Sequence, residues 1–175
     1  MSRIFHPTIL IITALLMSGC ITMPRSADLM VKSAKSGDLF TNKEIFEVSR
    51  SHSTVAKVLK KQANKCLSRD VSKTEPTPGN RLVSRTMVMG YTPEVSVSKK
   101  HTRVTVQEKT KSGAKDVGGP PPKGWYMMVV DAYPVSKKKT RIEVYYNTKS
   151  PFPAILAATK HWAAGTNMGC PDFLQ

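Results

Sequence analysis

The sequence predicts an α+β domain in which two helices pack on one antiparallel sheet of about five strands. Three observations support this class. Short segments with apolar residues at alternate positions are separated by turn-forming residues, as in strands joined by hairpins. Two longer segments carry apolar residues at intervals of three and four, as helices do. Their order is strand, helix, four strands, helix, in a single domain that we expect to span residues 40–175.

The first strand and the first helix are expected in residues 40–67. Ile45, Phe46 and Val48 indicate the strand within residues 40–49. Ser51 or Ser53 can cap the N-terminus of the helix that follows. Four lysines fall mostly on the helix face opposite the apolar one: Lys57, Lys60, Lys61 and Lys65. A solvated helix face and a binding surface are both consistent with this stripe, and the solvated face is the commoner case.

Four further strands follow residues 73–80, which contain two prolines and a glycine and which we expect to form a loop. The strands are expected at residues 81–91, 102–108, 125–130 and 140–146. Residues 111–124 include three successive prolines and predict a long loop. The lysine run at 137–139 lies between the last two strands and indicates an exposed hairpin tip.

The second helix is expected after Ser150, because Pro151 and Pro153 suit a first helical turn. Gly165 can end this helix in the left-handed conformation. A long terminal helix on a curved antiparallel sheet, after an early helix, resembles the helix-grip arrangement of several periplasmic lipoproteins, such as the barrel-assembly lipoprotein BamC. This is a likeness of element order alone and implies no function.

The first twenty residues predict a secretory signal. Arg3 is the only full charge before an uncharged run from Thr8 to Met17, and Ser18-Gly19 precede Cys20. A basic start, an apolar segment of about ten residues and small residues at a cleavage site define such a signal. The apolar run is shorter than the roughly 20 residues that a transmembrane helix needs.

The segment Met17-Ser18-Gly19-Cys20 resembles the lipobox of bacterial lipoproteins, with Met17 in place of the usual leucine. The resemblance implies removal of residues 1–19, a diacylglyceryl thioether on Cys20, and acylation of the new amino terminus, for example with palmitate. Because Ile21 rather than Asp follows the cysteine, it also implies the periplasmic face of the outer membrane. Residues 20–39 are polar and small without sustained periodicity and predict a flexible tether, within which residues 28–34 can form a short turn of helix. An ordinary signal peptide with a coincidental cysteine is the alternative.

Two cysteines remain if Cys20 carries lipid. The oxidising periplasm favours a disulfide between Cys66 and Cys170, and two buried free thiols are the alternative. A cysteine-based metal site is disfavoured, because the sequence has no CxxC motif and no histidine at ligand spacing from either cysteine.

The chain is strongly basic, with 27 Lys and Arg against 12 Asp and Glu and a formal net charge of +15 at pH 7. Such a balance indicates an anionic partner. For an exported protein the candidates are anionic lipid headgroups, lipopolysaccharide phosphates, peptidoglycan carboxylates or an envelope protein complex, and not nucleic acid. A solvated basic surface without a specific partner is the alternative.

The sequence offers no catalytic constellation. It lacks the HExxH, GxSxG and GxxxxGK patterns, and its carboxylates are scattered. We therefore expect no enzyme, no cofactor and no metal.

Two non-enzymatic functions remain. The first is a structural, assembly or docking role in the cell envelope. The second is a small binding module that holds an apolar or anionic ligand between the C-terminal helix and the sheet. Six side chains are candidates to line such a pocket, with an ordinary filled core as the alternative: Met87, Met89, Trp125, Met127, Phe152 and Trp162.

Overall fold

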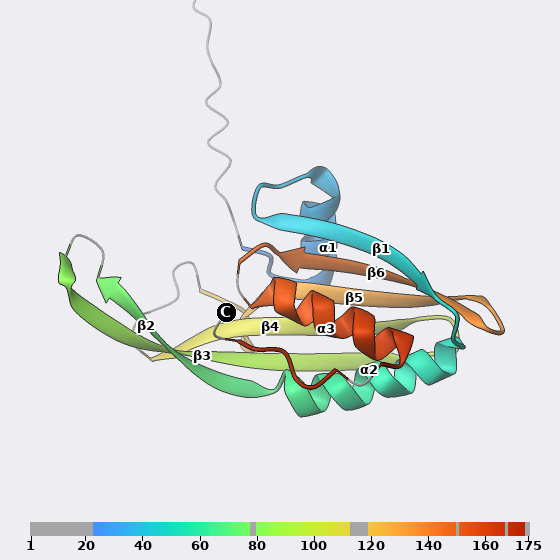
Figure 1. Cartoon of the computed structure of the whole chain (residues 1–175). Coiled ribbons are helices and arrows are strands. Elements are labelled where there is room, and N and C mark those ends of the chain that lie inside the picture. Colours follow the sequence, from blue (N-terminus) through green and yellow to red (C-terminus); the bar gives the residue numbers. More distant parts are fainter. Residues whose placement is uncertain (1–22, 78–79, 113–118, 150, 167, 174–175) are drawn as a thin grey trace, which may run out of the picture.

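A computed structural model describes residues 23–77, 80–112, 119–149, 151–166 and 168–173. It confirms the α+β class, with one antiparallel sheet of six strands and three helices among the described residues (Figure 1). This is one strand and one helix more than the sequence predicts. The signal segment and Cys20 lie outside the described residues.

The sheet has the order β1-β6-β5-β4-β3-β2. Strands β2 to β6 follow one another as hairpin-connected neighbours, and β1 pairs with β6 at the opposite edge, with Ile45 facing Glu143. The strands have these bounds: β1 Thr41–Val48, β2 Arg69–Thr77, β3 Asn80–Val97, β4 Thr102–Ser112, β5 Trp125–Ser136 and β6 Lys139–Asn147.

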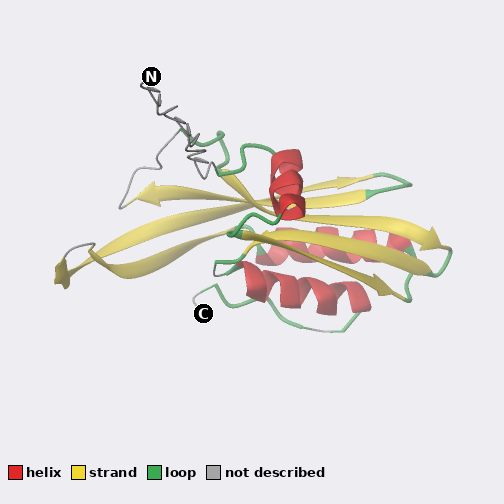
Figure 2. Cartoon of the chain, turned by 90° about the horizontal axis from the view of Figure 1, so that it is seen from above, coloured by secondary structure: helices red, strands yellow, loops and turns green. Residues whose placement is uncertain are grey.

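Two helices, α2 (His52–Cys66) and α3 (Phe152–Ala164), pack side by side on one face of the sheet (Figure 2). Ser51 caps α2 by accepting a hydrogen bond from the Thr54 backbone amide, and Gly165 ends α3 in the left-handed conformation (φ 86°), as expected. The main core lies between these helices and the sheet. Its largest fully buried members include Trp162, Phe152, Phe173, Leu67 and Ile155.

The third helix, α1 (Ala27–Ser36), covers part of the opposite face (Figure 2). The flexible tether expected over residues 20–39 is a packed helix in this stretch, longer than the short turn of helix that the sequence allowed at residues 28–34. Met30 and Ala34, one turn apart, are buried in a second small core against Val129 and Tyr145. Ser26 also caps the helix by accepting a hydrogen bond from the Leu29 amide. Packing against the sheet therefore stabilises a helix that is too short to be stable alone.

The loop expected at residues 73–80 was also wrong, because residues 73–77 belong to β2. Strand β2 is an edge strand, and its pairing with β3 becomes irregular between Pro76 and Thr77. An edge position tolerates proline, since one side of the strand needs no ladder hydrogen bonds. The β2–β3 hairpin extends beyond the rest of the sheet (Figure 1). Within the described residues, no helix is long and apolar enough to cross a membrane.

Candidate functional site

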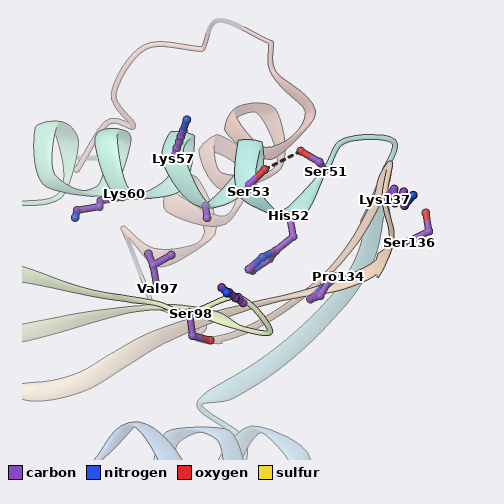
Figure 3. Close-up of a pocket in the computed structure, with 12 residues that line it drawn as sticks. Ser51, His52, Ser53, Lys57, Lys60, Val97, Ser98, Pro134, Ser136 and Lys137 are labelled. Atoms are coloured by element: carbon purple, nitrogen blue, oxygen red, sulfur yellow. Dashed lines mark hydrogen bonds between the residues drawn. The ribbon is translucent and has the colours of Figure 1, made fainter.

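A groove of about 810 Å³ lies at the end of the sheet where α2 begins (Figure 3). One wall belongs to α2, where Ser53, Ala56, Lys57 and Lys60 line the groove at spacings of three, four and seven residues, which places them on one helix face. The other wall is formed by the tips of the β3–β4 and β5–β6 hairpins. These tips contribute Val97, Ser98, Lys99, Pro134, Ser136 and Lys137.

Local hydrogen bonds hold the two hairpin tips in place. Ser98 donates its backbone amide to the His101 carbonyl (2.8 Å) and accepts the His101 amide on its side-chain oxygen (3.0 Å). This turn leaves Lys99 exposed at the tip. In the β5–β6 hairpin the Ser136 side chain accepts a hydrogen bond from the Lys138 amide, and Lys137 lies exposed in the turn.

The groove has a basic rim, and its lining combines apolar side chains with serines and His52. Lys57, Lys60, Lys99 and Lys137 are all exposed, and Figure 3 shows Lys57 pointing away from the strands while Val97 points toward α2. No carboxylate in the described part of the chain pairs with any of these four lysines. Ion pairs elsewhere hold seven acidic side chains: Asp28, Asp70, Asp131, Glu44, Glu47, Glu94 and Glu143. The positive charge at the groove is therefore uncompensated.

His52 lies at the base of the groove, where its ring points from α2 toward the strands (Figure 3). The side chain is buried, and its Nε2 lies 3.0 Å from the Thr102 hydroxyl. Burial lowers the pKa of His52 below its ordinary value of 6.5. A hydrogen bond to the Ala132 backbone partly offsets this effect by raising the pKa, and the nearby His101 lowers it slightly further. His52 is thus neutral at neutral pH.

The lowered pKa of His52 predicts acid sensitivity. Below pH 6.5 the unfolded chain takes up the His52 proton before the folded chain does, so the free energy of unfolding should fall as pH drops from 6.5 toward the folded pKa. His52→Gln should flatten this dependence in urea unfolding measured from pH 7.5 to 5. His161→Gln, which changes an exposed histidine at the end of α3, serves as the control and should leave the slope unchanged. Equal slopes for His52→Gln and wild type would contradict the assignment.

Four of the six side chains expected to form a pocket do lie together. Met87, Met89, Met127 and Phe152 line a cavity of about 320 Å³ at the start of α3, with Lys73, Glu108 and Lys149. The two tryptophans lie elsewhere. Trp162 is buried in the main core and donates its indole N–H to the Met168 carbonyl (3.1 Å), and Trp125 lies under the Arg25 guanidinium.

The structure also brings together two carboxylates that sequence reasoning left unconnected. Asp131 on β5 faces Glu143 on β6, and both are buried. Arg103 donates to both oxygens of Asp131 (2.7 and 2.8 Å), and the His101 ring lies 2.8 Å from one of them.

Glu143 is held in a similar way by Arg141 and by the Tyr145 hydroxyl. Burial, followed by this hydrogen bond, raises the pKa of Tyr145 above its ordinary range. Because cations and hydrogen bonds occupy both carboxylates of the pair, we interpret the cluster as structural. No group of three or more potential His, Cys, Asp or Glu metal ligands occurs in the described residues.

The expected disulfide joins Cys66, at the end of α2, to Cys170 in the C-terminal tail. Next to it Phe173 is buried, with its ring 4.9 Å from the Tyr91 ring and beneath the Arg69 guanidinium. The disulfide and this aromatic contact fix the tail to the domain.

Sequence reasoning found the lysines of the groove but not the groove. It treated Lys57 and Lys60 as part of one helical stripe and the lysine run at 137–139 as a separate hairpin tip, and it did not connect Lys99 with either. The signal that could have revealed the groove is the topology of the sheet. In a meander of hairpins, the β3–β4 and β5–β6 turns lie at the same end of the sheet, and this is the end at which the chain passes from β1 into α2.

Comparison with known proteins adds little to this picture. No protein-family model matches the chain, and no curated protein matches it. Among solved structures the chain is similar to a hypothetical protein from Helicobacter pylori, with 13% sequence identity and a TM-score of 0.38 over 77% of this chain and 89% of that chain. A likeness this distant carries no conclusion about function.

Proposed function

We propose that this protein is a lipoprotein of the cell envelope, anchored through lipid on Cys20 at the periplasmic face of the outer membrane, with a non-enzymatic docking role. Its domain engages an anionic envelope component through the lysine-rimmed groove. One observation carries the docking role. Three basic segments that are far apart in the sequence converge on one groove, and no described carboxylate neutralises their lysines.

The position of the groove relative to the anchor supports a partner away from the anchoring membrane. The chain joins the domain beside the start of β5, where the Tyr126 amide donates to the Pro24 carbonyl (3.0 Å). The groove includes Pro134 and Ser136 at the other end of this strand. At about 3.3 Å per residue, the ten residues from Tyr126 to Ser136 separate the two ends by roughly 33 Å.

The link between lipid and domain is short. Only residues 21 and 22 separate Cys20 from Met23, which packs against the main core, so this link spans at most about 11 Å. The anchor thus holds one end of the sheet near the bilayer, and the groove at the other end can lie far beyond the Debye length of about 8 Å. Anionic headgroups of the same membrane would then contribute little at the groove.

Crosslinking in intact cells tests the docking role. The experiment compares the full-length wild type with the groove variant Lys57→Glu/Lys60→Glu and with the control variant Lys61→Glu/Lys65→Glu. The control makes the same charge change on the same helix, but outside the groove lining. We expect defined envelope adducts with wild type and with the control pair, and their loss with the groove pair. Adducts that are the same for all three proteins would contradict the proposal.

A second candidate function is supported by the cavity at the start of α3. A cavity of about 320 Å³ lined by three methionines, a phenylalanine, two lysines and one glutamate is mostly apolar with one net positive charge, which suits a small apolar ligand with a negative charge. The anionic apolar dye 1-anilinonaphthalene-8-sulfonate provides a probe. The fluorescence of the dye should rise when wild type is added, and equally when the control variant Met168→Asp, changed at an exposed site, is added. The rise should be smaller with Met87→Asp. Equal responses of the two variants would count against this function.

A further inference from the structure

We infer that the lysine-rimmed groove takes an acidic amphipathic segment of a partner protein, about two helical turns in length. This inference rests on the proposed docking function and names the kind of partner. It concerns the groove lined by α2 and the two hairpin tips, and not the cavity at the start of α3.

The α2 wall has the geometry of a helix-docking face. Ser53, Ala56, Lys57 and Lys60 repeat at i, i+3, i+4 and i+7, which is the spacing that an amphipathic helix presents to a partner helix. From Ser53 to Lys60 this face extends seven residues, or about 10 Å. An occupant that follows the wall needs about two turns, with its own contact residues at the same spacing.

The chemistry of the groove requires an occupant that is both acidic and partly apolar. Lysines stand on both walls: Lys57 and Lys60 on α2, and Lys99 and Lys137 on the hairpin tips. Between them lie Ala56, which is 3% exposed, and Val97, which is 50% exposed and among the exposed large hydrophobic residues of the chain. Carboxylates on the two flanks of a helix would meet the lysines, and small apolar residues along its centre would cover the exposed Val97.

Other anionic polymers fit this lining less well. Among the described lining residues the one aromatic ring is the imidazole of His52, which is buried and lies within hydrogen-bond distance of the Thr102 hydroxyl, so the groove offers no exposed ring on which a base or a sugar could stack. A chain that carries only charge, such as a polyphosphate, would leave Val97 uncovered. Apolar contact together with charge complementarity therefore favours a protein segment over a glycan or a polyphosphate.

The apolar centre also decides how binding should respond to salt. Exposed lysine–carboxylate pairs are individually weak and are screened by salt. An amphipathic occupant should keep part of its affinity at high ionic strength, because burial of Val97 does not depend on screening. An occupant held only by charge should lose nearly all of its affinity at high ionic strength.

A defined peptide tests the inference with the full chain in detergent micelles. The probe is a fluorescein-labelled helical peptide of about 14 residues, with glutamates on both flanks and alanine and leucine along the centre. The control peptide has the same composition in scrambled order. Fluorescence anisotropy should show that the ordered peptide binds wild type at least about tenfold more tightly than the scrambled one.

Matched variants locate the binding. Lys57→Glu/Lys60→Glu and, separately, Lys99→Glu/Lys137→Glu should each weaken the ordered peptide about tenfold, and Lys61→Glu/Lys65→Glu should change it by less than about threefold. Val97→Ser should remove the affinity that persists at high salt. Circular dichroism of each variant checks that it is folded.

Three results would overturn the inference. These are equal binding of ordered and scrambled peptides, loss of binding in the Lys61→Glu/Lys65→Glu control, or binding of isolated peptidoglycan in place of the peptide with the same dependence on Lys57 and Lys60. If the peptide fails while adducts in intact cells still depend on Lys57 and Lys60, the docking function stands and the acidic helical segment is excluded. If both fail, the docking function fails too.

Discussion

Replacing both Cys66 and Cys170 with alanine is expected to lower the free energy of unfolding by about 2–4 kcal/mol. The disulfide joins residues that are 104 positions apart. In the chain-entropy model a loop of about 100 residues allows up to about 4.7 kcal/mol, and measured effects are commonly smaller. Without the bond, the unfolded chain regains conformational freedom that the cross-link had removed.

The C-terminal tail should keep part of its attachment in this variant. Phe173 is buried against Tyr91 and beneath Arg69, and these contacts do not require the disulfide. We therefore expect a folded variant of lower stability and not an unfolded one. Guanidinium unfolding, followed by tryptophan fluorescence, measures the difference.

Reduction supplies a matched control without a mutation. Wild type in dithiothreitol should lose about the same stability as the alanine variant, and the variant itself should not respond to dithiothreitol. If the variant and the oxidised wild type unfold at the same denaturant concentration, the disulfide contributes nothing to stability and the expectation is wrong.

Much of the fold could be predicted from local patterns. The helix that begins after Ser51 was predicted because apolar residues such as Val55, Leu59 and Ala63 recur on one face, and these side chains are buried in the main core. Strand β6 was predicted because Ile142 and Val144 alternate with charged residues. Glycine at position 165 indicated the end of α3, where a positive φ is needed.

Two elements could not be predicted in full from such patterns, because residues 28–34 indicated at most a short turn of helix and residues 73–80 indicated a loop. In α1 only Met30 and Ala34 are buried, and a flanking sequence rich in serine and lysine hides this short contact. Its stability comes from Val129 and Tyr145 on the sheet, which no local reading of residues 27–36 contains. In β2, Pro76 indicated a loop, because whether a strand lies at the edge of a sheet is a property of the completed topology.

The two candidate sites could likewise be predicted only in part from the sequence. Met87 and Met89 share a strand face, and a cavity near Phe152 could be anticipated from the proximity of the last helix to the sheet. Trp162 could not be separated from the filled core. The groove depends on which hairpin turns meet the start of α2, so the separate lysine groups predicted charge without predicting a site.

In the proposed function, lipid on Cys20 decides where the protein is located. Each buried methylene contributes about 0.8 kcal/mol, so one acyl chain binds a membrane marginally and two or three bind stably. Cys20→Ser removes the thiol that would carry the diacylglyceryl group. We expect this variant to lose the incorporated lipid, to change its electrophoretic mobility and to leave the membrane fraction. The Cys66→Ala/Cys170→Ala variant is the control, and it should stay lipidated and membrane-bound.

Intact mass spectrometry of the protein purified from membranes tests this account most directly. We predict a wild-type chain that begins at Cys20 and carries the mass of a diacylglyceryl group and an amide-linked acyl chain, and a Cys20→Ser chain without either. A wild-type chain that begins at another residue or carries no lipid would contradict the anchored location, as would a Cys20→Ser chain that remains membrane-bound with unchanged mobility.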